Sequence, residues 1–228
     1  MTNARCLIIS MNFAQYRSIW RHTLRWLIAG AWVLAPAFVQ SASIDGVVTD
    51  KSGAQLSDAV IYAVPNSGTA LAKPGRAAAV DQVNKDFMPL VTPVQTGTLV
   101  SFPNKDNIRH HVYSFSPPKT FELKLYSGVP SAPLLFDKPG VVVLGCNIHD
   151  WMLAYIYVVD TPYFAKTQNG RGRIEGLPAG EYDLKAWHPQ LRGAVLTQRV
   201  KVGADSADAI KFTLDLLPKP PQAVPAGK

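Results

Sequence analysis

Hydrophobic and polar positions in this chain follow short alternating runs rather than long helical stretches. The runs are rich in Val, Tyr, Phe or Thr and are bounded by Gly, Pro, Asn or Asp, which is typical of β-strands separated by turns. Beyond residue 43, no long stretch has the period of an amphipathic helix. The predicted strands cover residues 44–49, 59–63, 80–91, 98–102, 111–115, 121–126, 140–144, 153–159, 172–177, 181–187, 194–202 and 209–216.

Turn signals recur about every ten residues between these strands, which predicts an all-β fold built from β-sandwiches. Residues 65–78 contain two prolines and two glycines and are predicted to form a loop. The strand pattern pauses again in TPYFAKTQNG, residues 161–170, so we predict a domain boundary there. The Pro-rich end, residues 217–228, is predicted to be a disordered tail.

Residues 1–42 have the features of a signal peptide. The apolar stretch WLIAGAWVLAPAFV at residues 26–39 follows Arg17, Arg21 and Arg25, and small residues come after it. The alternative is a membrane anchor, but this stretch is shorter than the ~20 residues that a spanning helix needs, and Pro36 interrupts it. We therefore expect export to the periplasm and a mature form that is soluble and does not span the membrane.

The charge distribution argues against a nucleic-acid partner. The formal net charge is +7, but residues 1–42 contribute four arginines and no acidic residue. The rest of the chain holds 19 basic and 16 acidic residues, with no basic block. The length of 228 residues and the hydrophobic content of 47% indicate one or two globular domains.

Cysteine usage points to a metal. The chain has two cysteines, Cys6 and Cys146, which excludes a disulfide-dense scaffold. Removal of a signal peptide would leave Cys146 alone in an oxidising compartment, where a free reactive thiol is a liability. A bound metal ion is the simplest way to hold that sulfur.

The segment from Cys146 to Met152 reads Cys-Asn-Ile-His-Asp-Trp-Met and places three ligand types, including His149, at every third position. A tight loop of about three residues per turn would put all three on one side. Upstream, the adjacent His110 and His111 offer a further imidazole. Two His, one Cys and a weak axial Met form the ligand set of a blue-copper electron-transfer site.

Other interpretations of this segment fit less well. Zinc disfavours a Met ligand, and a closed zinc site prefers four Cys or His. A binuclear copper centre would need a second Cys, and a catalytic Cys would need an activating base and a substrate cleft. A buried Cys with incidental neighbours is the remaining structural alternative. Because side chains alternate along a strand, only one of His110 and His111 can face the metal.

Residues from about 80 to 160 resemble the cupredoxins, the small type 1 copper proteins that include plastocyanin, pseudoazurin and amicyanin. The C-x2-H-x2-M spacing is similar to that of amicyanin, and the run from Phe102 to His110, FPNKDNIRH, is similar to the segment before the family's first ligand His. The resemblance implies a Greek-key copper domain over residues 78–162. It also implies one mononuclear type 1 copper, held by the set His110, Cys146, His149 and Met152. His111 stands where the small proteins carry an Asn that bridges the ligand loops.

Three motifs extend the resemblance over most of residues 44–216. VSFPNKDNIRHHVYSFS, VVVLGCNIHDWM and TPYFAK together look like an exported, plastocyanin-like family of proteobacteria commonly called methylamine utilization proteins. That family name implies a link to amine oxidation through electron transfer.

The flanking segments have a resemblance of their own. IDGVVTDKSGAQLSDAVIYA and GRGRIEGLPAGEYDLKAWHP resemble a carboxypeptidase regulatory-like domain, which is a small transthyretin-like or immunoglobulin-like β-sandwich. We assign residues 43–66 and 168–216 to this module, with the cupredoxin domain inserted into it or packed beside it with shared strands. His188 is a candidate partner contact there, or a structural or surface histidine.

Residues near the predicted ligands have possible supporting roles. Trp151 would shield the copper or form a docking surface, or would be ordinary core packing. Asn104 would hydrogen-bond loops near the site, or would be a turn residue.

Two functions follow from the sequence. The first is a periplasmic one-electron carrier, not an enzyme, that exchanges electrons with a redox protein donor and acceptor. The alternative is a periplasmic copper-binding or delivery protein without an electron-transfer role. A carrier should cycle reversibly, whereas a delivery protein should favour one oxidation state and release it. The chain lacks the His-x-His pairs of a trinuclear copper cluster, so oxygen reduction is not expected.

Overall fold

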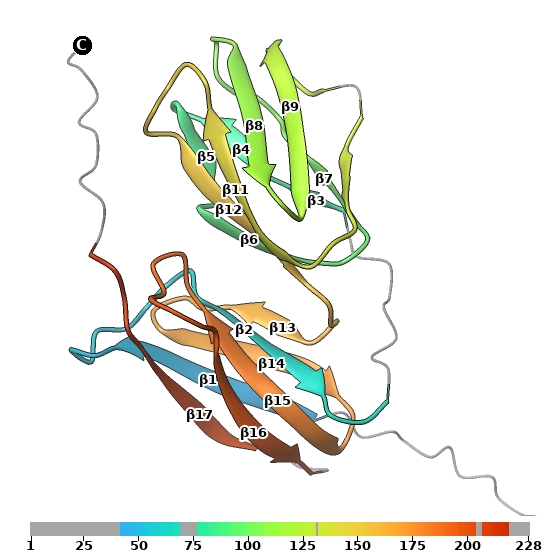
Figure 1. The fold of residues 1–228 in the computed structure, drawn as a ribbon, viewed down its shortest axis with the longest axis vertical. Coiled ribbons are helices and arrows are strands. Elements are labelled where there is room, and N and C mark those ends of the chain that lie inside the picture. The colour runs from blue at the N-terminus through green and yellow to red at the C-terminus, as the bar shows by residue number, and fades with distance from the viewer. Residues whose placement is uncertain (1–41, 69–76, 131, 204–206, 219–228) are drawn as a thin grey trace, which may run out of the picture. The chain divides into compact units, whose positions relative to one another are not determined.

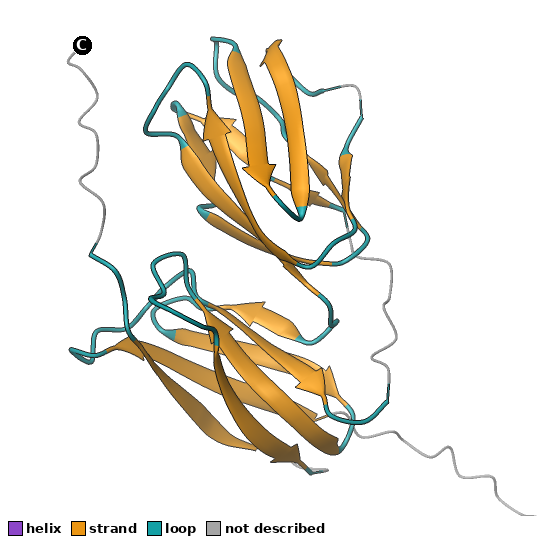
Figure 2. Ribbon diagram, viewed as in Figure 1, coloured by secondary structure: helices purple, strands orange, loops and turns teal. Residues whose placement is uncertain are grey.

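The computed structural model describes residues 42–68, 77–130, 132–203 and 207–218, and every regular element within these ranges is a strand (Figure 2). The all-β class predicted from the sequence is therefore confirmed. Nearly all of the predicted signal peptide and most of the predicted Pro-rich tail lie outside the described residues. Within the ranges given, no helix has the length and apolar character needed to cross a membrane.

The strands, in chain order, are β1 (Ala42–Asp50), β2 (Val60–Pro65), β3 (Ala78–Ala79), β4 (Asp81–Val83), β5 (Asp86–Met88), β6 (Val91–Gln95), β7 (Thr98–Ser101), β8 (His110–Ser116), β9 (Lys119–Tyr126), β10 (Leu134–Phe136), β11 (Gly140–Cys146), β12 (Leu153–Val159), β13 (Phe164–Lys166), β14 (Arg171–Leu177), β15 (Gly180–Trp187), β16 (Leu196–Val202) and β17 (Ala207–Leu214). Figure 1 labels most of them.

Strands from the two ends of the described chain form two facing sheets. The first has the order β14-β1-β17, and the second has the order β13-β2-β15-β16. Alternate residues of β1, such as Ile44 and Val48, are buried with Ile61 of β2 in one hydrophobic core. A Cβ at Gly46 would lie 2.6 Å from Cδ1 of Ile61, so glycine lets that side chain approach β1 closely.

Strands between residues 78 and 159 form a second core. A five-stranded sheet has the order β6-β12-β11-β8-β9, a three-stranded sheet has the order β10-β7-β3, and β4 and β5 form a separate hairpin. The core holds large side chains from several of these strands, with Phe87, Phe102, Phe136 and Ile156 almost fully buried. In the part of the chain that the structure describes, no sheet combines strands of this set with strands of the flanking set.

A smaller hydrophobic cluster contains residues from both sets of strands. Val60 of β2 and Trp187 of β15 are buried in it together with Val91 of β6 and Tyr157 of β12. The rings of Tyr157 and Trp187 stack with centroids 4.5 Å apart. The outward face of the five-stranded sheet is thus partly covered by apolar side chains.

The region predicted as one strand over residues 80–91 contains a hairpin and the start of β6. Asn84 and Lys85 both have positive φ angles, of 56° and 60°, and connect β4 to β5. Two consecutive residues of this kind close a two-residue hairpin turn. Asn is a common residue in such turns but Lys is not, so only the first of the two positions carries a usual turn residue. The short strands β10 and β13 were also not predicted, because three residues are too few to establish alternation.

Candidate metal centre

The predicted ligands come from one end of the five-stranded sheet. β8 begins at His110 and the antiparallel β11 ends at Cys146, which pairs with Val112. Residues 147–152 connect β11 to β12. The Asn147 N–H donates to His111 O at 3.1 Å, and the Met152 N–H donates to His149 O at 3.1 Å. These backbone bonds place the connecting loop beside the start of β8.

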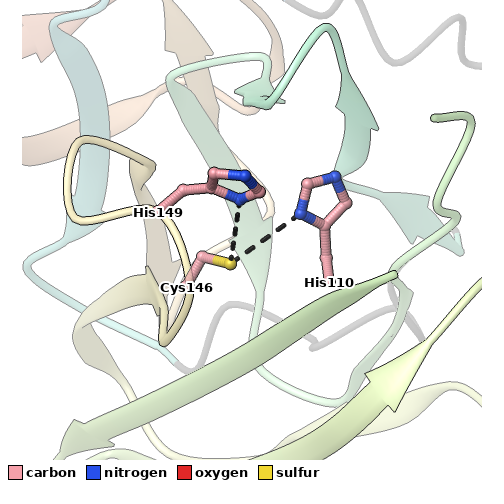
Figure 3. Close-up of side chains that lie close together, drawn as sticks. All are labelled: His110, Cys146 and His149. Atoms are coloured by element: carbon pink, nitrogen blue, oxygen red, sulfur yellow. Dashed lines mark hydrogen bonds between the residues drawn. The ribbon is translucent and has the colours of Figure 1, made fainter. Parts of the chain in front are cut away.

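Three side chains converge in this loop region. The Sγ atom of Cys146 lies 3.8 Å from Nδ1 of His110 and 3.8 Å from Nδ1 of His149. The donor atoms of all three residues lie within 4.8 Å of one another. Figure 3 shows both imidazole rings turned toward the sulfur. The arrangement is that of three ligands around a common point.

The spacing of these donors fits a metal ion. Bonds of roughly 2.0 Å to nitrogen and 2.3 Å to sulfur that meet at about 120° would separate the two donor atoms by roughly 3.7 Å. The separations of 3.8 Å match this value and are long for a hydrogen bond to a thiol. A thiolate with two imidazoles suits copper or zinc better than calcium or magnesium, which prefer oxygen ligands.

The protonation of His149 also favours metal binding. Burial lowers the pKa of His149, and the positive charges available to His110 and Lys85 lower it further, against the opposite effect of Asp106. The neutral imidazole, which is the form that binds a metal, is therefore favoured at neutral pH. His110 and Cys146 are buried, and His149 is partly exposed. The site is closed on the core side and open to solvent beside His149.

Met152, the predicted axial ligand, is buried immediately before β12. Only 2% of its surface is exposed, and it belongs to the same hydrophobic cluster as Cys146. A buried thioether near a thiolate suits a soft ion such as Cu(I). Its assignment as a ligand remains a prediction.

His111, the neighbour of His110, lies on the opposite face of β8. His110 is fully buried, whereas the Nε2 atom of His111 lies 2.8 Å from Oε1 of Glu122 on β9. The donor cluster includes His110 and not His111. Strand alternation separates the two imidazoles, as expected from the sequence pattern.

Asn104 connects the segment before β8 to the end of β9. Its Nδ2 atom donates to Ile108 O at 2.8 Å and to Tyr126 O at 2.9 Å, and its Oδ1 atom accepts from the Asp106 N–H at 3.0 Å. The side chain is almost fully buried, with 5% exposed. It therefore fixes the loop that leads to His110, without contacting the three donors.

Asp106 is a candidate functional residue that the sequence analysis missed. Its Oδ2 atom lies 2.8 Å from Nε2 of His110, on the ring edge opposite the sulfur. Burial raises the pKa of Asp106, but backbone donors at Lys85 and Asn84 and the contact with His110 outweigh it, so that the pKa is lowered. A charged carboxylate here holds the proton on Nε2 and leaves Nδ1 free to bind a metal. The sequence signal for it is its place in the run FPNKDNIRH, four residues before His110.

Trp151 lies against His149 at the rim of the loop. The two ring centroids are 5.1 Å apart, and Nε1 of Trp151 donates to Lys85 O at 3.0 Å. About a third of the side chain is exposed, at 36%. The ring planes are tilted by 55°, so the indole packs against the His149 ring at an angle and leaves part of itself at the surface.

His188 directly follows β15, in the flanking set of strands. It is buried, with 8% exposed, and its Nδ1 atom accepts a hydrogen bond from the Gln190 N–H at 3.1 Å. This placement fits a structural histidine rather than a surface contact for a partner.

Comparison with solved structures shows that part of this chain is similar to copper proteins. Neither the protein-family models nor the curated proteins gave a match. A purple cupredoxin from Nitrosopumilus maritimus is 20% identical over 36% of this chain and 99% of its own, with a TM-score of 0.32. An amicyanin variant in its Cu(I) form is 20% identical over 43% of this chain and 99% of its own, with a TM-score of 0.33.

A longer copper protein is also similar. A Cu-containing nitrite reductase from Thermus scotoductus is 27% identical over 42% of this chain and 25% of its own, with a TM-score of 0.35. The structural neighbours are thus cupredoxins and a copper enzyme, matched over part of the chain. At TM-scores this low, the assignment of the site depends on the donor atoms themselves.

Proposed function

We propose that this protein binds one copper ion through His110, Cys146 and His149, with Met152 as a weaker axial ligand, and carries single electrons. The observation that supports this most directly is the convergence of one sulfur and two Nδ1 atoms at separations of 3.8 Å. When bound there, copper would supply a centre that alternates between Cu(I) and Cu(II). The two imidazoles suit both states, the thiolate is a strong soft donor, and the thioether tunes the potential.

The chain's own residues give the site the properties of a carrier. Cys146 and His110 are held by two hydrogen-bonded strands and are buried in a packed core, so they change little between oxidation states. His149 is partly exposed beside Ile148 and Trp151, which expose 46% and 36% of their surfaces. This partly apolar surface around an exposed ligand is where we expect a redox partner to approach.

The surroundings of the site favour a carrier over an enzyme. With the buried Met152 as a fourth ligand beside the three donors, the ligand set would be complete, and the proposed ion would have no open position for a substrate. The alternative of copper delivery requires that the ion leave, which the buried positions of Cys146 and His110 disfavour.

We further propose that the carrier works in the periplasm, between a redox protein donor and acceptor. The export pattern of residues 1–42 supports the location. The resemblance to methylamine utilization proteins supports an amine-oxidising system as the source of electrons. Fractionation of cells that express the full chain, followed by mass determination of the product, tests the location and the cleavage.

The proposed function is tested by adding Cu(II) to the purified chain and recording its visible and electron paramagnetic resonance spectra. An intense thiolate-to-copper band at one copper per chain, absent in Cys146→Ala, is expected. Reversible oxidation and reduction without loss of copper then supports a carrier. Copper bound without that band, or released on reduction, would contradict the carrier and favour delivery.

A further inference from the structure

The hairpin turn between β4 and β5 contacts both segments that carry the proposed ligands. The backbone N–H of Asn84 donates to Oδ1 of Asp106 at 2.6 Å, and that of Lys85 donates to Oδ2 at 2.9 Å. Asp106 in turn contacts Nε2 of His110 at 2.8 Å. Through this carboxylate, the turn is connected to the ligand on β8.

The same turn holds the other ligand segment with its carbonyl group. Nε1 of Trp151 donates to Lys85 O at 3.0 Å, and the Trp151 ring packs on His149. The turn thus binds a carboxylate with two amide groups and an indole with one carbonyl. The positive φ angles of Asn84 and Lys85 bring the two N–H groups to the same carboxylate.

Apart from the turn, the two ligand segments are connected through the pairing of β8 with β11. The side chain of His111, next to the first ligand, extends to Glu122 on β9 instead. Asn104 bonds the backbone of its own loop and of β9. Beyond the pairing of β8 with β11, the Asn147 N–H donates to His111 O and also joins the two segments.

We infer that the β4–β5 turn is a clamp that sets the orientation of His110 and His149 relative to each other. Asp106 and Trp151 are its two positioning residues, and Asn84 and Lys85 join them. The planes of the two imidazoles cross at 57°, with centroids 5.0 Å apart, and the clamp maintains this arrangement before a metal enters. The role of the clamp in copper binding rests on the proposed function. The contacts that form it are present in the chain without copper.

Because the clamp exists without metal, hydrogen exchange in the copper-free chain tests it directly. Trp151→Phe keeps an aromatic ring against His149 and removes the indole donor. We expect exchange at the Asn84 and Lys85 amides to rise by about two- to tenfold, which corresponds to the loss of one hydrogen bond. Asp106→Asn, in the reciprocal experiment, should raise exchange at the indole Nε1–H of Trp151.

Trp187→Phe is the matched control, because Trp187 lies in the cluster with Tyr157 and not at the turn. The clamp is refuted if Trp151→Phe and Trp187→Phe have the same effect at Asn84 and Lys85, or if Asp106→Asn leaves the Trp151 indole unchanged. Lys85→Gly places a residue suited to positive φ at this position and should preserve the coupling between Asp106 and Trp151.

Copper loading separates this inference from the proposed function. In the loaded chain, Trp151→Phe should shift the copper hyperfine splitting or the midpoint potential, whereas Trp187→Phe should not. If the chain takes no copper, the proposed function fails while the exchange data still decide the clamp. If copper binds and the exchange rates show no coupling, the clamp fails and the proposed function stands.

Discussion

Gly145 lies directly before Cys146, and replacing it with Ala should destabilise the protein through one neighbour, Tyr113. The two residues are paired across β11 and β8. A Cβ at Gly145 would lie 2.7 Å from Cζ and 2.8 Å from Oη of Tyr113, well inside van der Waals contact. The φ angle of Gly145 is not positive, so the alanine backbone itself is not strained there.

The expected size follows from two opposing terms. Overpacking of a side chain costs about 1–3 kcal/mol, and the lower part of this range applies because Tyr113 is partly exposed and borders a surface groove with Val143 and Leu153. Replacing glycine with alanine in extended backbone stabilises the protein by roughly 0.4–1 kcal/mol, because it lowers the conformational entropy of the unfolded chain. We expect Gly145→Ala to lower the free energy of unfolding by about 1 kcal/mol.

A second background tests this reasoning. In Tyr113→Ala the ring is absent, so the same Gly145→Ala change should become neutral or stabilising by roughly 0.4–1 kcal/mol. The assay is chemical denaturation of the copper-free chain, followed by circular dichroism. An equal loss of stability in both backgrounds would show that the cost does not come from the ring. With copper added, Gly145→Ala should also alter the spectrum, because it displaces the strand that ends at Cys146.

Other predictions concern the ligands and a distant histidine. His110→Gln should abolish the thiolate-to-copper band, while His111→Gln should leave it in place, as measured by copper titration. Met152→Leu is close in volume and apolar, so it should keep the band and shift the midpoint potential measured by voltammetry. Burial lowers the pKa of His188, so the stability this neutral ring supports is complete above its unfolded pKa of 6.5 and is lost as the pH falls below it. Thermal midpoints from pH 7 to pH 5 should fall less in His188→Gln; an identical fall would contradict this.

The sequence predicted those parts of the fold and site that depend on local pattern. Strands such as β12 were recognisable from their composition and bounding turns. Cys146, His149 and Met152 lie within one short segment, so their spacing alone identifies them as candidate ligands. Alternation of side chains along a strand predicts only that one of His110 and His111 faces inward. The resemblance of the preceding run to the cupredoxins is what favours His110.

The parts that the sequence did not predict depend on tertiary contacts. Lys85 has no tendency toward positive φ, so the pattern predicts a continuous strand where Asn84 and Lys85 form a turn. Asp106 lies in the run that resembles the segment before the family's first ligand His, but its contacts are not predictable, because its partners at residues 84 and 85 lie more than twenty positions away in the sequence. The short strand β13 is defined by pairing with β2 rather than by its own composition.

The position of β1 has a consequence for the order in which this chain can fold. β1 is among the first described residues, yet its two neighbours, β14 and β17, end at Leu177 and Leu214. The strands between residues 78 and 159 find their partners among themselves, so their core can be complete while β1 is still unpaired. Until the last strand leaves the ribosome, β1 lacks its partner β17 and exposes hydrogen-bonding groups and alternate apolar side chains. β1 therefore needs to be shielded during synthesis. Two copies of the chain would associate wrongly in the interval before the flanking sandwich is complete, and this interval is long because its strand pairs are far apart in the sequence.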